Sequence, residues 1–237
     1  MFRFMTALLV LAVVVPATAS PGATIFTTVD DAQVSTAVDA AGTSGQVGFS
    51  GTDARNVVYV FPLPSALLAG GAQDNEKFDT ATFSARLNGV DGTLTFNADL
   101  YGLDYRTTPT VLLADRYAGS GDVNATLIQD NFVTPSAGSG RKFTDSDGDE
   151  ALVSYLNGQL TAARQAGATS AYVFLRLSPD IVGNNFLRYK FDMREVNTNN
   201  FYWAKIDYTT MPIPEPGFAG ALGLMACAGL MARRRVG

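Results

Sequence analysis

Apolar and polar residues alternate along much of the chain, and clusters of Gly, Asn, Asp and Pro interrupt the alternation. Over 81–87 every second residue is apolar, and the same is true over 94–101. A two-residue period is typical of a strand with one buried face. The pattern predicts further strands at 57–63, 125–133, 171–177, 185–193 and 202–209, and a weaker one at 23–29.

The segments between these strands define the expected fold. Residues 88–92 read Asn-Gly-Val-Asp-Gly, which tolerate positive φ, so we expect a hairpin loop joining the first pair of strands. Over 149–165 apolar residues recur at helical spacing, which predicts one helix with Gly167 as its C-cap. Because βαβ alternation is absent, the sequence predicts a mainly β fold: an antiparallel β-sandwich, jelly-roll-like, with one inserted helix.

The N-terminal segment differs from this body. A positive charge at Arg3 precedes a wholly apolar run over 7–15, and Ala17-Thr18-Ala19 supplies an A-x-A cleavage site. These features are typical of a cleavable signal peptide, and the apolar run is too short for a membrane anchor. We therefore expect 1–19 to be removed by signal peptidase, leaving Ser20 as the mature N-terminus.

The C-terminal segment, 214–237, has three parts in a fixed order. Pro214, Glu215 and Pro216 precede an uncharged run over 217–232, and Arg233, Arg234 and Arg235 follow it. As a helix the run would span roughly 24 Å, slightly less than the ~30 Å hydrocarbon core, so it would be a marginal transmembrane anchor. The alternative is a buried core helix followed by a basic tail.

This tripartite order resembles the PEP-CTERM sorting signal of Gram-negative bacteria. The resemblance implies that an exosortase in the inner membrane recognises the tail, cleaves near the triplet and passes the protein toward the surface. The arginines would stay in the cytoplasm under the positive-inside rule, which leaves 20–213 outside. The expected location is therefore the cell surface or the extracellular space, after transient anchoring in the inner membrane.

Charge and composition narrow the function of the body, which we take as one domain over 20–213. Without the two end segments the chain loses four of its 17 basic residues and one of its 22 acidic residues, so the body has a charge near −8. Nucleic acid and anionic lipid would need a basic surface, so neither is an expected partner. The only cysteine, Cys227, lies in the tail, which leaves the mature domain without a disulfide.

The chain contains no histidine. Ser-His-Asp and Cys-His hydrolases and the usual histidine-bearing zinc sites are therefore excluded. A glycosidase that uses two carboxylates is not excluded, because the fold alone decides whether such a pair forms.

The middle of the chain carries a second resemblance. The segments NADLYGLDYRTTPTVLLADRYAG, NATLIQDNFVTPSAG, DEALVSYLNGQL and AYVFLRLSPD follow one another between 80 and 180. In this order they resemble the DNRLRE-type β-sandwich, which is similar to carbohydrate-binding modules and occurs in exported bacterial proteins. The resemblance implies a jelly roll that acts as an accessory or surface domain, and it implies no defined ligand residues.

An acidic cluster precedes the expected helix, and it has two interpretations. Asp145, Asp147, Asp149 and Glu150 place carboxylates at alternate positions, as a Ca²⁺-binding loop does. The match to an EF-hand loop is incomplete, because Glu150 stands where glycine is required and Leu156 where a bidentate glutamate is required. In the other interpretation these acids cap the helix N-terminus. No cofactor other than calcium is expected.

Aromatic residues provide the last candidate site. Four aromatic residues fall on the opposite parity from the apolar strand positions: Tyr101, Tyr172, Phe174 and Trp203. They would therefore point outward together and could stack on sugar rings. The alternative is that they pack against a covering loop, the helix or the second sheet.

Taken together, these features predict an exported, non-catalytic surface or matrix protein. A carbohydrate-binding module for exopolysaccharide is the first alternative, and a carboxylate-dependent glycosidase is a more remote one.

Overall fold

The structure is a computed structural model, and it describes residues 20–28, 30–40, 44–117, 125–180, 186–196 and 198–213. Within these ranges the chain is mainly β with one α-helix, as the alternation predicted. The strands are β1 (Ala23–Phe26), β2 (Ala32–Val34), β3 (Val38–Ala40), β4 (Ser44–Ser50), β5 (Asp53–Pro62), β6 (Glu76–Asp91), β7 (Ala98–Arg106), β8 (Ala125–Val133), β9 (Gly140–Phe143), β10 (Tyr172–Pro179), β11 (Arg188–Asp192) and β12 (Lys205–Pro212). The helix is α1 (Ser146–Gln165), and three 3-10 turns are η1 (Ser65–Leu67), η2 (Leu113–Asp115) and η3 (Arg194–Val196).

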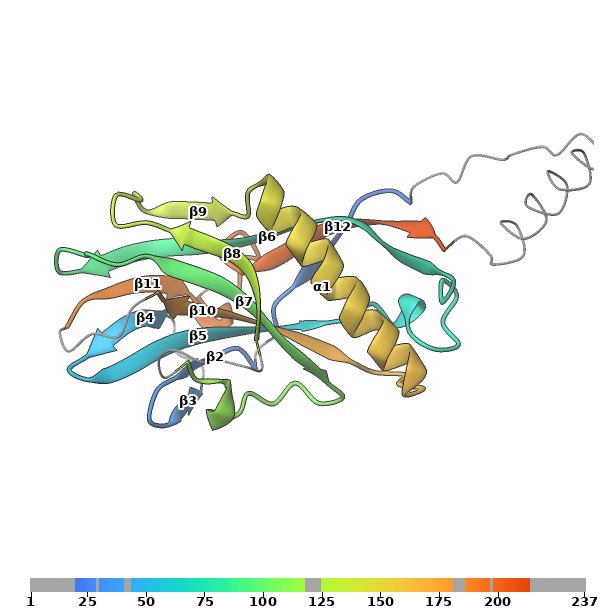
Figure 1. The fold of residues 1–237 in the computed structure, drawn as a ribbon, viewed down its shortest axis with the longest axis horizontal. Helices are drawn as coiled ribbons and strands as arrows, with labels where there is room; N and C mark the ends of the chain where they lie inside the picture. Colours follow the sequence, from blue (N-terminus) through green and yellow to red (C-terminus); the bar gives the residue numbers. More distant parts are fainter. Residues whose placement is uncertain are drawn as a thin grey trace, which may run out of the picture.

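The strands form one strongly curled antiparallel sheet (Figure 1). Its order is β1-β12-β6-β11-β4-β5-β10-β7-β8, with β2 beside β5, β3 beside β2 and β9 beside β6. The β4–β5 hairpin connects the two halves of the sheet and is paired only near its turn, from Gly48 with Arg55 to Ser50 with Asp53. The sheet therefore folds over on itself and encloses one core.

The long strand β6 organises one half of the sheet. Ser84 pairs with Lys205 of β12 and with Phe143 of β9, so these two strands lie on opposite edges of β6. Leu87 pairs with Phe191 of β11 on the edge opposite β9. It follows that β12 and β11 line one edge in succession, whereas the first part of the other edge has no strand beside it.

Helix α1 packs along that uncovered edge, between β6 and the pair β7 and β8. Its Asn157 accepts a hydrogen bond from the Phe78 N–H of β6 and donates one to the Phe78 carbonyl, both at 2.9 Å. Gln159 accepts from the Tyr105 N–H of β7 at 2.8 Å, and the Tyr155 hydroxyl donates to the Leu103 carbonyl at 2.5 Å. Side chains of the helix thus satisfy backbone groups that a neighbouring strand would otherwise pair.

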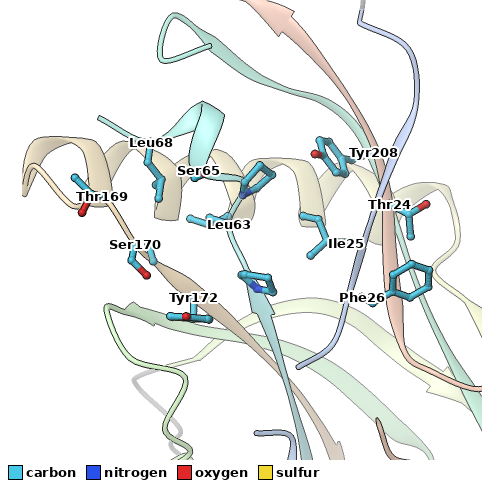
Figure 2. Close-up of a pocket in the computed structure, with 13 residues that line it drawn as sticks. Thr24, Ile25, Phe26, Leu63, Ser65, Leu68, Thr169, Ser170, Tyr172 and Tyr208 are labelled. Atoms are coloured by element: carbon cyan, nitrogen blue, oxygen red, sulfur yellow. The ribbon is translucent and has the colours of Figure 1, made fainter. Parts of the chain in front are cut away.

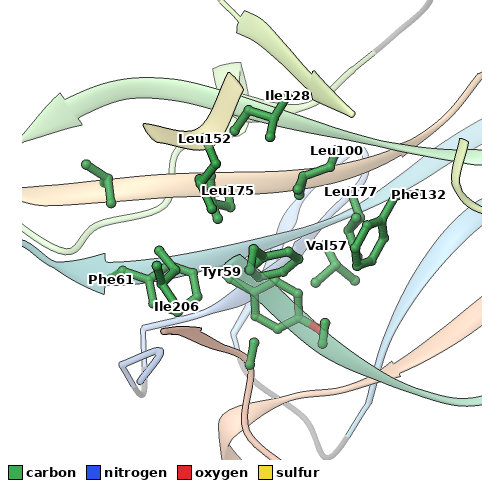
Figure 3. Close-up of a cluster of buried hydrophobic side chains, with 14 of the residues drawn as sticks. Val57, Tyr59, Phe61, Leu100, Ile128, Phe132, Leu152, Leu175, Leu177 and Ile206 are labelled. Atoms are coloured by element: carbon green, nitrogen blue, oxygen red, sulfur yellow. The ribbon is translucent and has the colours of Figure 1, made fainter. Parts of the chain in front are cut away.

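The core lies between the two halves of the sheet and α1. Figure 3 shows Tyr59 and Phe61 of β5, Leu175 of β10 and Leu152 of α1 directed into the same space. Strand β5 is also buried on its other face, where Val58 and Val60 meet Phe174 of β10 and Val34 of β2. A fully buried aliphatic or aromatic side chain contributes roughly 1.5–3 kcal/mol, so this cluster is the main source of stability.

Three sequence expectations needed correction. The segment 88–92 is not a hairpin loop, because β6 continues to Asp91 and pairs there with Arg188 of β11 rather than with β7. Residues 94–97 are not in a strand, although Leu94 and Phe96 are buried in the core. The helix begins at Ser146 instead of Asp149, because Asp145 caps it.

Gly167 follows the C-cap Ala166 with a φ of +66°. Its N–H donates to the Arg164 carbonyl, and the Ala168 N–H donates to the Ala163 carbonyl, both at 2.9 Å. This is the Schellman ending, in which glycine tolerates the left-handed backbone.

The expected signal peptide and sorting tail lie outside the described residues. In the part of the chain that the structure describes, no helix has the length and apolar character needed to cross a membrane.

Candidate functional site

A groove opens where β1 separates from β5. The residues just after β1 meet β5 at Val60, where the Thr28 N–H donates to the Val60 carbonyl at 2.7 Å and Thr27 Oγ1 accepts from the Val60 N–H at 3.2 Å. The next residues on that edge are Pro62, the last residue of β5, and Pro64 just after it, and proline has no N–H to donate. Pairing therefore stops, β1 continues beside β12, and β5 continues beside β10.

The resulting cavity has a volume of about 490 Å³, within the range of small-ligand sites. Figure 2 shows Tyr208 of β12 and Tyr172 of β10 on opposite sides of it, with Leu63 and Ile25 between them. The remaining lining residues are Thr24, Phe26, Pro62, Pro64, Ser65, Leu68, Thr169, Ser170 and Ala171. The groove thus combines tyrosine rings, aliphatic side chains and hydroxyl groups.

The backbone of β1 also faces this groove. The Thr27 N–H donates to the Ala204 carbonyl at 3.0 Å, which makes these two residues a hydrogen-bonded pair. Because such pairs alternate along an antiparallel ladder, Ile25 also bonds to β12, whereas Thr24 and Phe26 direct their backbone groups to the other edge. One wall therefore offers N–H and carbonyl groups, and the opposite wall presents two prolines.

Electrostatically the groove is neutral. None of its lining residues carries a charge. Burial raises the pKa of Tyr208, so its phenol stays protonated at neutral pH. The Tyr208 ring is held edge-on to Phe78 at 5.2 Å between ring centroids, and Phe26 is held edge-on to Trp203 at 5.7 Å. Two aromatic walls are therefore fixed in position before any ligand binds.

The structure buries Phe174 completely, against the expectation that it points outward, and separates the other three candidate aromatic residues. Tyr172 lies in the groove. Tyr101 stacks on Tyr117 with ring centroids 6.4 Å apart, and both rings face the buried Arg176, so Tyr101 packs against a covering segment. Trp203 lies behind Phe26 rather than in the groove lining. The three residues do not form a single outward row.

The acidic cluster acts first as a cap. Asp145 Oδ1 accepts from the Gly148 N–H at 2.9 Å, and Asp145 Oδ2 accepts from Gln129 at 3.2 Å. Asp149 accepts hydrogen bonds from Thr82, at 2.8 Å, and from Thr144. The helix-capping interpretation is therefore confirmed for Asp145.

Asp147 and Glu150 of the same cluster are exposed. Among the residues that the structure describes, no group of three or more acidic or cysteine side chains converges as metal ligands would. Calcium binding by Asp145, Asp147, Asp149 and Glu150 stays a prediction.

Two carboxyl groups have strongly raised pKa values. Burial raises the pKa of Asp31 to about 8 and that of Asp99 to about 6. Both side chains are almost fully buried, and neither lines the groove. The glycosidase alternative stays a prediction without a pair of carboxylates in this site.

Comparisons with known proteins gave no relative. No protein-family model matches the chain, and a search of curated proteins found no match. The resemblances to PEP-CTERM signals and DNRLRE-type domains therefore rest on the quoted residues alone.

Sequence reasoning named Tyr172 but missed most of the groove. The alternation places Tyr208 and Phe26 in strands without indicating a role for either, and nothing in their local pattern indicates that β1 and β5 separate. The one usable signal is the Pro62-Leu63-Pro64 sequence at the end of a strand, since proline marks an edge where pairing stops.

Proposed function

We propose that this chain is an exported, non-catalytic protein of the bacterial cell surface or extracellular matrix, delivered by an exosortase-type sorting system. The observation that carries the proposal is the position of the two expected processing sites. The Ser20 N–H donates to the Thr210 carbonyl at 2.9 Å, and the Ile213 N–H donates to the Asn75 carbonyl at 2.7 Å. Both processing sites therefore adjoin one end of β12, and cleavage there would leave the ladders of the domain intact.

We also propose that the domain is a jelly-roll-like sandwich. The curled antiparallel sheet with one helix supports a jelly-roll-like sandwich of the DNRLRE type. Signal peptidase and an exosortase would be its partners during export from a Gram-negative-type cell, with the tail as a transient inner-membrane anchor.

Intact-mass measurement tests the sorting step. Protein from cells with an exosortase should begin at Ser20 and lack Arg233–Arg235, and protein from cells without the exosortase should retain the arginines. Replacing Pro214 and Pro216 with alanine should block the second cleavage, whereas Pro135→Ala, in an exposed loop, should not. Unprocessed ends in cells with an active sorting system would refute the proposal.

A second candidate function, carbohydrate binding, is favoured by the chemistry of the groove. Tyrosine rings stack on the apolar faces of sugars, and hydroxyl and backbone groups bond to sugar hydroxyls. The lining contains Tyr172, Tyr208 and several Ser and Thr residues but no charge, which suits an uncharged segment of exopolysaccharide.

Affinity electrophoresis through the host's exopolysaccharide tests this second function. The protein should be retarded, and Tyr172→Ala should remove at least most of the retardation. Tyr117→Ala is the matched control, because Tyr117 is also a half-buried tyrosine but lies outside the groove. If Tyr172→Ala and Tyr117→Ala are retarded by the polysaccharide to the same extent, the groove is excluded as the binding site.

A further inference from the structure

The segment that follows β11 folds back over the sheet and is held by arginines. Arg141 of β9 donates to Ser84 Oγ at 3.0 Å and to the Trp203 carbonyl at 3.1 Å. Arg86 of β6 lies 4.8 Å from the centre of the Tyr202 ring. The Arg194 side chain, from η3, lies over the Trp203 ring. These contacts bring η3 and the 198–204 turn together on the outer face of the sheet.

Asp31, which immediately precedes β2, forms a hydrogen bond with the backbone of η3. Its Oδ2 accepts a hydrogen bond from the Arg194 N–H at 2.9 Å, across 163 residues of sequence. Its side chain is buried, with 1% of the residue exposed, and no donor among the described residues reaches Oδ1. The group that meets the Asp31 carboxyl is the carboxyl of Glu195.

Two carboxyl groups form a hydrogen bond only if a proton lies between them. A proton on Asp31 removes its buried charge and provides a donor to Glu195. Without that proton, the buried Asp31 carries a negative charge away from water and next to the negative charge of the exposed Glu195, which is unfavourable. The contact between η3 and Asp31 thus depends on protonation.

The other charged groups nearby do not replace this proton. Arg194 favours the ionised form of Asp31, but burial has the larger effect, and Glu195 and Asp30 add negative charge. Asp192 of β11 is paired with Arg86 at 2.6 Å. Tyr59 of β5 has a pKa well above its ordinary value because of burial, and Arg141 lies close to it. Tyr59 therefore stays neutral while Asp31 titrates.

We propose that the proton shared by Asp31 and Glu195 is a latch that fastens η3 and Trp203 to the sheet, and that its loss at alkaline pH releases them. The direction of the pH effect follows from the linkage between proton binding and opening. The closed form binds the proton more tightly than an open form with a solvated Asp31, so opening becomes more favourable as pH rises toward the pKa of about 8 in the closed form.

The latch also acts on the groove. Trp203 packs edge-on against Phe26, and Phe26 forms one wall of the groove. Release of Trp203 removes the support of that wall. The proposal concerns the state of the protein alone and does not depend on which ligand the groove binds.

Trp203 provides the readout, because it is the single tryptophan of the 237-residue chain. Its emission would be recorded on the full-length protein from about pH 5 to about pH 9.5, below the ordinary tyrosine pKa of about 10. We expect a reversible red shift and increased acrylamide quenching as pH rises through about 8. Far-UV circular dichroism should stay constant, which separates local opening from unfolding.

Two variants and one control complete the test. Asp31→Asn carries no charge and still offers a donor to Glu195, so its emission should not change with pH. Glu195→Gln removes the neighbouring negative charge but leaves Asp31 buried, so the shift should remain and its midpoint should move to lower pH, which tests the pair if Asp31→Asn does not fold. Asp99→Asn, a buried carboxyl that makes no contact with η3, should keep the wild-type profile. A flat wild-type profile, a shift that persists in Asp31→Asn, or an unchanged midpoint in Glu195→Gln would overturn the latch.

Discussion

Asn157 of α1 forms a two-bond pair with the backbone of Phe78 in β6, with both hydrogen bonds at 2.9 Å. A neighbouring strand makes the same kind of contact with its main chain. Here a side-chain amide replaces the strand, which explains how a helix can complete the edge of a curled sheet.

Replacing Asn157 with alanine should therefore destabilise the domain. Each hydrogen bond contributes about 0.5–1.5 kcal/mol net, so the free energy of unfolding should fall by about 1–3 kcal/mol. Gln159→Ala removes one such bond, to the Tyr105 N–H, and should cost about half as much. Urea denaturation measures the free energy of unfolding of the two variants, and Asn88→Ala, at an exposed position, is the control. Equal stability of Asn157→Ala and Asn88→Ala would contradict the role of the amide.

Two glycines should respond to alanine in opposite directions. A Cβ at Gly102 of β7 would lie 2.4 Å from the Tyr155 ring, so Gly102→Ala should destabilise by about 1–3 kcal/mol. Gly158 lies on the exposed side of α1 with nothing within 4 Å of the added Cβ, so Gly158→Ala should stabilise by about 0.5–1 kcal/mol. Thermal denaturation of the two variants should show melting temperatures on either side of the wild-type value.

The buried Asp99 should make stability depend on pH. Burial raises its pKa to about 6, and the folded state then holds a proton that the unfolded state has lost. The proton on Asp99 therefore contributes to the free energy of unfolding, fully below about pH 4 and progressively less as pH rises to about 6. The loss is up to about 3 kcal/mol, since one pKa unit is about 1.36 kcal/mol. Asp99→Asn should remove this part of the slope in urea denaturation. An unchanged slope would show that Asp99 is ionised in the folded protein.

The cap and the calcium interpretations of Asp145 can be separated. Asp145→Ala should destabilise by about 1 kcal/mol without metal, whereas Asp145→Ser, which can still cap, should cost much less. If calcium binds, calorimetry should show millimolar or tighter binding that is lost when Asp145, Asp147 and Asp149 are all replaced by alanine. No heat and no shift in melting temperature with calcium would leave only the cap.

The tail should not contribute to the stability of the domain. Strand β12 ends at Pro212, and the Ile213 N–H already bonds to Asn75. Deleting 217–237 should change localisation and leave the melting temperature nearly unchanged. Loss of the cooperative transition in circular dichroism would show that the tail belongs to the core.

The sequence predicted individual strands better than their partners. The sequence placed β8 at 125–133, where the structure has Ala125–Val133, although its burial does not alternate strictly, since Ile128, Phe132 and Val133 are buried and Leu127 is exposed. It failed for the pairing of β6 and β7, since the loop residues at 88–92 tolerate a hairpin but the long-range contact with β11 determines the register. The short strands β2, β3 and β9 carry too few residues for a period to be recognised.

The candidate sites show the same limit. Asp145 was identifiable as a cap because the cap and its helix are adjacent in sequence. The groove and the carboxyl pair were not, because Asp31 and Arg194 are 163 residues apart and become neighbours only when η3 folds over the sheet. Burial, which sets the pKa of Asp31, is a property of that packing and not of any local motif.

The first and last residues of the domain lie close together, at one end of β12. Ser20 and Ile213 flank one end of β12, and Thr24 and Tyr208, which line the groove, lie a few residues away (Figure 1). A protein held by that end would keep its groove next to the point of attachment, while the β4–β5 turn would extend outward. If the domain is attached at that end, as proposed, the groove faces the layer to which it is attached and the β4–β5 turn points away from that layer.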